Sequence, residues 1–298
     1  MEKIKVAVIG AGGKMGTRTS NNLVTKFPDK FDVKLVETFP PAVERIEKER
    51  GLKVTPVDEA LAFADVVIFA VPDTLIKKLS AEYVPMLKPG TVFLILDPAA
   101  AVAKELTLRD DCTFGVAHPC HPSYFKWQKE EEAYQDRFGG EGGHQDIVMS
   151  CIQGDEEKFK LAQETARCMY RADKAFVMTS EQIAFLEPTL VETLGATCCY
   201  AMAETVNEAV KRGIDREAAV SFLTGHVFNL TANFLGYLPG NPPVSDACKV
   251  ALEIGNHLVL RDDWKKIWDD ELLRKVIANM LHPETSQENL GFDVKPQK

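Results

Sequence analysis

A glycine-rich turn directly after an apolar run constrains this chain more than any other feature. Residues 4–9 read Ile-Lys-Val-Ala-Val-Ile, as a buried strand would, and Gly-Ala-Gly-Gly-Lys-Met-Gly follows at 10–16. The first glycine allows a sharp turn, the middle pair brings bare backbone close to a ligand, and the last lets a helix pack closely on the strand. This order predicts the first βα turn of a dinucleotide-binding sheet, with the pyrophosphate on free N–H groups at the helix N-terminus. The cofactor-binding residues predicted in this turn are Gly10, Ala11, Gly12, Gly13, Lys14, Met15 and Gly16.

An acidic residue at the expected distance favours this interpretation over an ordinary tight turn. The second apolar run, residues 31–36, ends at Glu37, 21 residues after Gly16 (37 − 16). A spacing of about 20 is usual for the carboxylate that binds the adenosine ribose. A carboxylate there also repels a 2′-phosphate, by about 1 kcal/mol in water and about 4 kcal/mol at a partly buried site, for two unit charges about 4 Å apart. We therefore expect Glu37 to bind the ribose of NAD rather than NADP; the alternative is a solvent-exposed glutamate at a strand end.

Length and charge narrow the class of protein. With 298 residues the chain exceeds the size at which a single core keeps growing, so two domains are expected. The formal charge of −9 argues against sequence-independent nucleic-acid binding and against a polybasic membrane anchor. The sequence has no run of about 18 apolar residues that would predict a membrane span, and a strand begins too early for a signal peptide. Seven scattered cysteines indicate reduced thiols, so a cytoplasmic protein is expected.

Strands and helices alternate through the first part of the chain. Apolar runs typical of strands buried on both faces lie at 64–73, 91–97, 113–117, 146–152 and 174–178. This pattern predicts an α/β fold with a doubly wound, parallel Rossmann sheet, whose ligands gather at the carboxyl ends of the strands. Val71, Pro72 and Asp73 are therefore expected to border the cofactor. Residues 123–143, rich in charge, aromatics and glycine, are expected to form a surface excursion or lid.

From residue 180 onward the pattern is helical only. The chain is therefore predicted to consist of an NAD-binding Rossmann domain at 1–179 and an all-helical domain for substrate binding and dimerisation at 180–298. A helix at 190–212 is apolar on nearly every side, as a helix wrapped by protein would be. A core shared by two subunits would supply that cover, so we expect a homodimer. Two further helices are predicted at 217–235 and 244–260.

A histidine follows the predicted strand at 113–117. His118 comes at the carboxyl end of this strand, where the ligands of such a sheet gather. There it would orient a substrate hydroxyl, act as the general base for its proton, or bind a metal. The alternative is a turn histidine that caps a strand. His121 is a weaker candidate, because two histidines in a segment with prolines at 119 and 122 are not a helical metal pair.

Two acidic residues begin the apolar helix of the second domain. Glu187 and Glu192 are not needed there for solubility, and buried carboxylates are usually paired or bound to a cation. Pro188 suits the first turn of a helix, which would put Glu187 at its entry and Glu192 just over one turn further. The alternative is a helix-start charge favoured by the helix dipole. Weaker candidates on later helices are His226 with Asn229, which share a face, and Asp246 with Lys249, which either reach a site or pair with each other.

With these features the chain resembles the superfamily of 3-hydroxyacid and 6-phosphogluconate dehydrogenases and its relative prephenate dehydrogenase, whose His-Pro pair is similar to His118-Pro119. In the hydroxyacid enzymes the interdomain helix carries a catalytic lysine and, one turn on, an asparagine. The corresponding positions here fall near Pro188 and Glu192, so the lysine is missing. Carboxylates in its place are similar to the ketol-acid reductoisomerases, whose metal is held by acids on the helical domain.

Three motifs together most closely resemble the D-apionate oxidoisomerase family. They are the glycine turn, Ala-His-Pro-Cys-His-Pro at 117–122, and Phe-Leu-Glu-Pro-Thr-Leu-Val-Glu-Thr at 185–193. The resemblance implies NAD-dependent oxidation of a branched sugar acid, followed by migration of a hydroxymethyl group to the new carbonyl carbon. Such chemistry needs a base and a cation that polarises the ketone. We therefore hypothesise that His118 with Glu187 or Glu192 holds Zn or Mg, and that His118, Glu192 and His226 are the catalytic side chains.

Two other functions stay open. A plain hydroxyacid dehydrogenase without rearrangement would use His118 as the base and no metal, and its product would be a simple keto acid. A non-catalytic NAD-binding regulator would keep the sheet and lose the chemistry. In that case replacement of His118 by alanine would leave the activity of its pathway intact.

Overall fold

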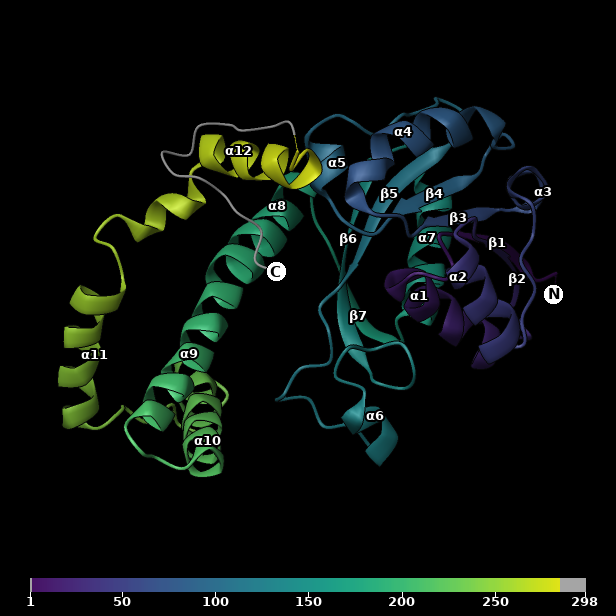
Figure 1. Cartoon of the computed structure of the whole chain (residues 1–298). Helices are drawn as coiled ribbons and strands as arrows, with labels where there is room; N and C mark the ends of the chain where they lie inside the picture. The colour runs from purple at the N-terminus through teal and green to yellow at the C-terminus, as the bar shows by residue number, and fades with distance from the viewer. Residues whose placement is uncertain (1, 285–298) are drawn as a thin grey trace. The chain divides into compact units, whose positions relative to one another are not determined.

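The computed structural model describes residues 2–284, and its contacts divide the chain into two compact units (Figure 1). The first unit contains the chain up to Ala184 together with the chain from Arg274, and the second is Phe185–Leu273. The sequence predicts two consecutive segments instead, 1–179 and 180–298. The difference arises because the chain returns to the first unit after the helical one.

The returning segment includes most of helix α12 (Asp270–Leu281). Its apolar side chains Ile277 and Leu281 are buried. Directly after the helix, Nε2 of His282 lies 2.8 Å from a carboxylate oxygen of Glu105. Apolar burial and this polar contact together hold the end of α12 on the first unit.

The first unit is built on a seven-stranded sheet in the order β2-β1-β3-β4-β5-β6-β7 (Figure 1). The strand order reverses at β1, from which the chain winds in both directions. Helices follow most strands, and a helical unit follows the sheet, so the predicted doubly wound α/β fold with an all-helical second part is confirmed. The strands are β1 (Ile4–Ile9), β2 (Phe31–Val36), β3 (Val66–Phe69), β4 (Val92–Ile95), β5 (Thr113–Pro119), β6 (Gln145–Gln153) and β7 (Ala172–Val177).

The expectation of an entirely parallel sheet is wrong at one pair of strands. β5 and β6 run antiparallel, with Ala117 opposite Met149 and His118 opposite Val148. A parallel neighbour requires a crossover of a dozen or more residues, usually a helix, on one face of the sheet. Between β5 and β6 the chain forms only the five-residue helix α6 (Glu131–Gln135) and returns from the edge at which β5 ends.

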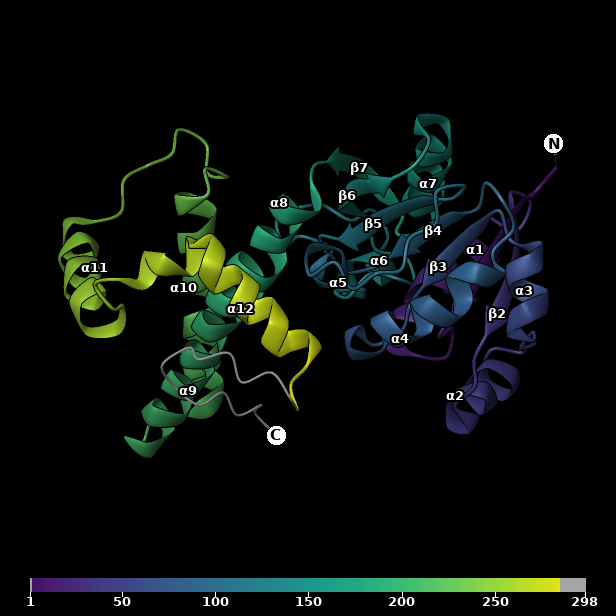
Figure 2. The same ribbon diagram turned by 90° about the horizontal axis from the view of Figure 1, so that it is seen from above.

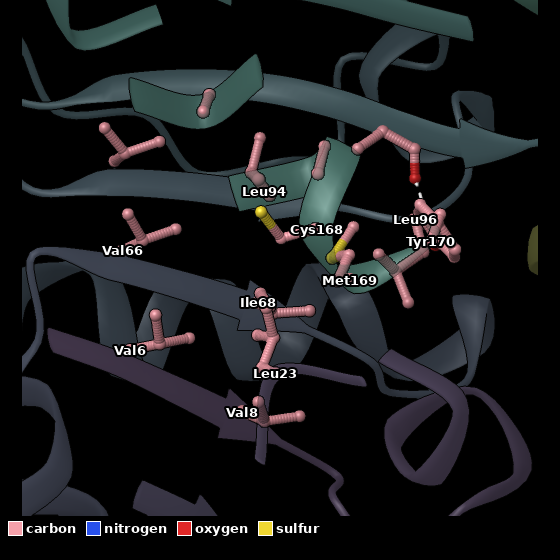
Figure 3. Packing of buried hydrophobic residues seen from close by; sticks show 14 of the residues in the cluster. Val6, Val8, Leu23, Val66, Ile68, Leu94, Leu96, Cys168, Met169 and Tyr170 are labelled. Atoms are coloured by element: carbon pink, nitrogen blue, oxygen red, sulfur yellow. Dashed lines mark hydrogen bonds between the residues drawn. The ribbon is translucent and has the colours of Figure 1, made fainter. Parts of the chain in front are cut away.

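Alternating side chains of the central strands pack on the two faces of the sheet. On one face Val8 and Ile68 belong to a buried cluster that includes Leu23 of α1 (Lys14–Thr25) and Met169 of α7 (Glu156–Met169), as Figure 3 shows. Figure 2 shows α4 (Asp73–Tyr83) and α7 on opposite sides of the strands. The period-two alternation of a strand therefore places the core on both faces of the sheet.

On the α4 face of the sheet, aromatic rings form a row. The ring centroids of Phe69 and Phe93 are 4.9 Å apart, and those of Phe93 and Phe114 are 5.6 Å apart. Tyr83 of α4 meets Phe69 edge-on at 6.4 Å. These contacts hold β3, β4 and β5 in register behind the carboxyl ends that form the candidate site.

The remaining helical elements of the first unit are α2 (Pro40–Glu44), the π-helical η1 (Arg45–Glu49), α3 (Val57–Phe63), η2 (Val84–Met86), α5 (Ala99–Val102) and α8 (Ser180–Ala184). The second unit contains the π-helical η3 (Phe185–Ala196), α9 (Thr197–Lys211), α10 (Arg216–Phe234), α11 (Asp246–Val259) and η4 (Trp264–Trp268). Within residues 2–284, none of the helices combines the length and the hydrophobicity that a membrane span requires.

The helices of the second unit leave much apolar surface exposed in the single chain. Of the 19 residues of α10, all of them described, only Ala232 is buried, and α11 buries none. Phe222 is 71% exposed and Leu258 is 80% exposed. Large exposed apolar faces of this kind are typical of surfaces that another protein covers.

Candidate functional site

The glycine turn joins β1 to α1 and depends on close backbone contacts. Gly10 has φ +77°, a left-handed conformation that favours glycine. A Cβ atom on Gly16 would collide with the carbonyl oxygen of Gly10, and one on Gly12 would lie 2.7 Å from the Cβ of Ala42. The turn therefore tolerates no side chain at these positions. Because the first N–H groups of a helix have no acceptor within the helix, those of α1 are available for an anionic ligand.

The carboxylate of Glu37 closes on this turn from the end of β2. Its Oε2 accepts a hydrogen bond from the Gly12 N–H at 3.1 Å. Its Oε1 accepts from the N–H groups of Thr38 at 2.8 Å and Phe39 at 3.0 Å. Oε2 has one protein donor and retains a lone pair for a ribose hydroxyl. The carboxylate therefore lies at the turn, as the spacing between Gly16 and Glu37 predicts, and its binding to the ribose stays a prediction.

Other strand ends follow along the same edge of the sheet. A Cβ atom on Gly10 would lie 2.5 Å from the carbonyl oxygen of Ala70 and 3.4 Å from Cγ1 of Val71, so the β3–α4 loop borders the turn. In the sheet order, β1 is followed by β3, β4 and β5, which ends with His118 and Pro119. Three strand spacings of about 4.8 Å place β5 roughly 14 Å from β1. A dinucleotide bound at the turn and extended along this edge would reach the end of β5.

His118 is the penultimate residue of β5 and is half-buried. Its Nδ1 lies 2.7 Å from the carbonyl oxygen of Leu96, at the end of the neighbouring strand. A carbonyl oxygen accepts only, so Nδ1 carries the proton and donates it. In the neutral ring Nε2 therefore carries the lone pair. A histidine oriented in this way is able to act as a base or as a metal ligand through Nε2.

Residues 123–143 fold back on the first unit around one carboxylate. Oδ2 of Asp136 accepts from four successive N–H groups, those of residues 140–143, and Oδ1 accepts from the Gly139 N–H. Burial raises the pKa of Asp136, but these backbone hydrogen bonds outweigh it and lower the pKa to about 2. The weaker candidate His121 belongs to this region, since its Nδ1 lies 3.0 Å from the Phe138 carbonyl oxygen and its ring packs on that of Phe138.

The two candidate glutamates lie on the π-helical segment η3 of the second unit. Pro188 stands inside this segment and not in a first turn, so the sequence-based placement of the helix start is wrong. A proline in a helix interior has no N–H to donate and clashes with the carbonyl four residues earlier, here that of Ala184. In a π-helix the hydrogen bonds close from residue i to i+5, so Glu187 and Glu192 are separated by about one turn.

The structure leaves the pairing of His118 with these glutamates as a prediction, because they belong to different units. Glu187 is half-buried and Glu192 is exposed. Among the residues that the structure describes, no group of three or more His, Cys, Asp or Glu side chains is placed to hold a metal ion. The metal and its ligand set therefore enter below as a proposal.

The remaining candidates lie on the exposed surfaces of α10 and α11. Nδ1 of His226 lies 2.7 Å from the carbonyl oxygen of Phe222 one turn earlier, and its ring stacks on the Phe222 ring at 4.1 Å. Asn229 is exposed on the same helix. Nζ of Lys249 donates to the carboxylate of Asp246 at 2.8 Å, so these two residues pair with each other.

Sequence reasoning missed one side chain at the turn. Nη2 of Arg45 donates to the carbonyl oxygen of Gly12 at 2.8 Å, on the other side of that residue from Glu37. Arg45 lies in a charged helical segment, since every residue from 44 to 50 except Ile46 is basic or acidic. No spacing rule distinguishes the one that reaches back to the turn.

Known proteins match both parts of the chain. Residues 1–114 match the family described as acetohydroxy acid isomeroreductase, NADPH-binding domain, and residues 126–281 match phosphogluconate dehydrogenase (decarboxylating) C-term. A D-apionate oxidoisomerase of Blautia hydrogenotrophica is 72% identical over 96% of this chain and 100% of its own length. A D-apionate oxidoisomerase of Cupriavidus necator is 42% identical over 93% and 99%.

A solved structure is also similar. It is a semialdehyde dehydrogenase NAD-binding protein from Cupriavidus necator in complex with calcium and NAD. It has a TM-score of 0.88 and 41% sequence identity, over 94% of this chain and 100% of that one.

A Rossmann sheet with a glycine turn, followed by a helical unit, defines an enzyme of the oxidoreductase class in the 6-phosphogluconate dehydrogenase-like superfamily. Both family matches and the similar structure agree with that class. Within it, the chain belongs to the D-apionate oxidoisomerase family.

Proposed function

We propose that this chain oxidises a branched sugar acid of the D-apionate type with NAD and couples the oxidation to rearrangement of the carbon skeleton. The observation that carries the proposal is the orientation of His118. Its Nδ1 donates to Leu96 at the end of β4, so Nε2 is the basic atom on the sheet edge that also carries the glycine turn. The names of the two relatives supply the substrate class.

The proposed reaction has two steps. In the oxidation, the hydrogen of the carbinol carbon would leave as hydride toward the bound nicotinamide, and the hydroxyl proton would pass to the carboxylate of Glu192, which leaves a ketone. Nε2 of His118 would meanwhile hold the cation described below. In the rearrangement, the neighbouring tertiary hydroxyl loses its proton and its carbon becomes the new carbonyl. The bond to the hydroxymethyl group moves with its electron pair to the first carbonyl carbon, whose oxygen takes up a proton. One sugar acid and NAD⁺ thus give one rearranged keto acid, NADH and one proton.

The residues of the first unit fit NAD. The glycines of the turn carry no side chains, so the backbone N–H groups there can approach the pyrophosphate closely. Glu37 is placed by three backbone N–H groups to accept from the ribose hydroxyls. Its negative charge disfavours the 2′-phosphate of NADP. The similar structure from Cupriavidus necator, which is a complex with NAD, supports this choice.

The available donors also fit a divalent cation. His118 offers Nε2, and Glu187 with Glu192 offers carboxylate oxygens about one turn apart on η3. Imidazole with carboxylates suits Zn, whereas carboxylates alone suit Mg. The calcium in the similar structure supports a cation site with oxygen ligands. When bound, such a cation would polarise the ketone and stabilise the neighbouring alkoxide during the rearrangement.

We also propose that a second copy of this chain covers the apolar helices of the second unit. Phe222, Phe234 and Leu258 are each more than half exposed. A two-fold contact would pack the same faces of α10 and α11 against each other and would bury these side chains. A fully buried side chain of this size gains about 1.5–3 kcal/mol, so a few of them suffice for a stable dimer.

The reaction is tested by product analysis with D-apionate and NAD. The expected result is NADH and a rearranged keto acid in equal amounts, and a loss of turnover after chelation that added Mg or Zn reverses. His118→Asn is expected to lower kcat by about 100-fold or more, as for loss of a ligand of the catalytic cation, with little change in the Kd of NAD. His121→Asn is the matched control and is expected to keep most of the activity.

Each competing function predicts a different result. A simple keto acid and full turnover with chelator would indicate a plain dehydrogenase. NAD binding without any NADH formation would indicate a regulator. Full activity of His118→Asn would contradict the role of His118 in either enzyme.

A further inference from the structure

The helical segment η3 of the second unit keeps a π-helical register over 12 residues. It follows α8 directly in the chain and passes directly into α9. In a π-helix the backbone hydrogen bonds join residues five apart, and such turns are rare, mostly one turn long and frequent at functional sites. A π register kept over a whole segment needs contacts that favour it, and this segment carries both candidate glutamates, Glu187 and Glu192.

Thr193 supplies one such contact. Its Oγ1 donates to the carbonyl oxygen of Pro188, five residues earlier, at 2.6 Å. A threonine in an α-helix donates instead to a carbonyl oxygen three or four residues earlier. Thr205 of the adjoining α9 does so, with the carbonyl oxygen of Ala201 at 2.9 Å. The hydroxyl of Thr193 therefore bonds across the wider turn of η3.

Gly195 also matches the wide turn. A Cβ atom on Gly195 would lie 3.3 Å from the carbonyl oxygen of Leu190, again five residues earlier. That distance is shorter than an ordinary van der Waals contact, so a side chain at this position would press on the backbone of the preceding turn. Together with Thr193, this glycine gives η3 two features that suit carbonyl groups five positions back.

Contacts with η4 fix the side of η3 that faces the protein. Oγ1 of Thr189 donates to the carbonyl oxygen of Ile267 at 3.4 Å. The ring of Phe185 stacks on that of Trp268, with the ring centroids 5.8 Å apart. Pro188 and Thr189 are buried. The segment η3 is therefore held in its rotation about the helix axis as well as in its register.

The register decides how Glu187 and Glu192 lie relative to each other, because they are five residues apart. In an α-helix of about 3.6 residues per turn, five residues make about 1.4 turns, so the two side chains would point about 140° apart. In the π register each turn is roughly one residue longer, and residues five apart lie close to the same side of the helix. The two carboxylates are thus neighbours only while η3 stays π-helical.

We propose that Thr193 is a positioning residue, which holds η3 in the π register and so brings the carboxylates of Glu187 and Glu192 to one divalent cation. This inference rests on the cation of the proposed function and adds the side chain that sets its ligand geometry. Each carboxylate has two oxygens, so Glu192 can bind the cation through one and still accept the substrate proton with the other. Thr193 acts through the backbone of η3 and needs no contact with the cation.

Titration of Mn²⁺ into the chain saturated with NAD, followed by electron paramagnetic resonance, tests the role of Thr193. We expect one bound Mn²⁺ per unaltered chain. Thr193→Val keeps the shape of the side chain and removes the hydroxyl. It is expected to weaken Mn²⁺ binding about tenfold or more, the usual cost of losing a group that supports a metal ligand. Thr193→Ser keeps a hydroxyl and is expected to restore most of the affinity.

Two further sets of variants complete the test. Thr205→Val removes a hydroxyl from α9 and is the matched control, which is expected to bind Mn²⁺ as the unaltered chain does. Glu187→Gln and Glu192→Gln are each expected to weaken Mn²⁺ binding about tenfold or more, because each removes a charged ligand. The Kd of NAD is expected to stay unchanged in all of these variants, since the proposed NAD site lies in the first unit.

Equal Mn²⁺ affinity in Thr193→Val and in the unaltered chain would overturn the role of Thr193 and leave the proposed cation in place. Circular dichroism and the Kd of NAD check the folding of this variant; if it does not fold, Thr193→Ala is read in its place. Unchanged affinity in either glutamate variant would overturn the shared site. No Mn²⁺ binding by the unaltered chain would contradict the cation of the proposed function and this inference together.

Discussion

Glu37 ends β2 with its carboxylate held by the N–H groups of Gly12, Thr38 and Phe39. These hydrogen bonds place the charge before any ligand arrives, so a ribose hydroxyl meets an acceptor that needs no reorganisation. In the proposed binding mode, the same placement would put a negative charge next to the 2′-phosphate of NADP. If Glu37 binds the ribose as proposed, this single side chain would contribute both to the affinity for NAD and to discrimination against NADP.

Glu37→Gln tests this discrimination. The amide keeps the shape and one acceptor oxygen but removes the charge, so about 1–4 kcal/mol of repulsion toward the 2′-phosphate disappears. We expect the Kd of NADP to fall by about tenfold or more and the Kd of NAD to rise. Glu44→Gln, an exposed change on the neighbouring helix α2, is the control. Unchanged discrimination between the two cofactors, measured by fluorescence titration, would show that Glu37 is not the ribose ligand.

At the residue scale, the sequence predicts groups that follow a spacing rule. Glu37 lies at a fixed distance along a strand–helix–strand unit, and the structure places its carboxylate on the turn. Arg45 and Arg18 reach their positions through long side chains that cross from one element to another. Such contacts depend on tertiary packing, and local sequence carries no period that distinguishes them from other surface charges.

At the scale of elements, the strands were predictable and two departures were not. Continuous apolar runs identify β3 and β4, but the sequence does not state the direction of β6 relative to β5. The absence of a long helix between β5 and β6 is a signal for an antiparallel return. Likewise, the sequence places a helix start at Pro188, because proline is common in the first turn of a helix. In the structure the helical path already begins at Ser180 and continues as the wider π-helical segment η3, with Pro188 inside it.

The loop of residues 136–143 is the element whose stability depends most clearly on one charge. Asp136 has a pKa of about 2, below its usual 3.8, because backbone N–H groups stabilise the carboxylate. A depressed pKa contributes stability above the unfolded-state value, and this contribution is lost as pH falls from about 4 to about 2. Asp136→Asn is therefore expected to lower the free energy of unfolding by about 2 kcal/mol at pH 7, the scale of hydrogen bonds to a charged group.

The difference between Asp136→Asn and the unaltered chain is expected to shrink below pH 4. Urea unfolding at pH 7, 4 and 3 measures it, with exposed Asp110→Asn as the control. An equal difference at every pH would mean that the loop depends on the shape of the side chain and not on its charge.

At the scale of the whole molecule, the apolar composition and the exposure of the helices in the second unit are the basis for the proposed dimer. The sequence predicts a helix at 190–212 that is too apolar to face water, and in the single chain Val191 and Tyr200 of this stretch are half exposed. The side chains of α10 and α11 are largely exposed as well. Sequence periodicity does not say what covers them, because a helix buried by its own chain and one buried by a second copy have the same composition. The proposed dimer would cover these helices, and the mass of the particle in solution tests it.

Sedimentation is expected to give a mass near twice the 33.1 kDa of the chain. Phe222→Glu combined with Leu258→Glu is expected to shift the protein toward the monomer, because two charges would have to be buried in the contact. Leu108→Glu, on an exposed apolar residue of the first unit, is expected to leave the mass unchanged. A monomer at micromolar concentration for the unaltered chain would contradict the dimer.

The proposed reaction depends most directly on His118 and a glutamate of η3 meeting at one cation beside the nicotinamide. A crystal structure with NAD and Mn²⁺, read from the anomalous signal of the metal, measures this arrangement. The expected result is one peak within bonding distance of Nε2 of His118 and of a carboxylate oxygen of Glu187 or Glu192, next to the nicotinamide ring. A peak bound elsewhere, or side chains on separate surfaces with NAD in place, would contradict it.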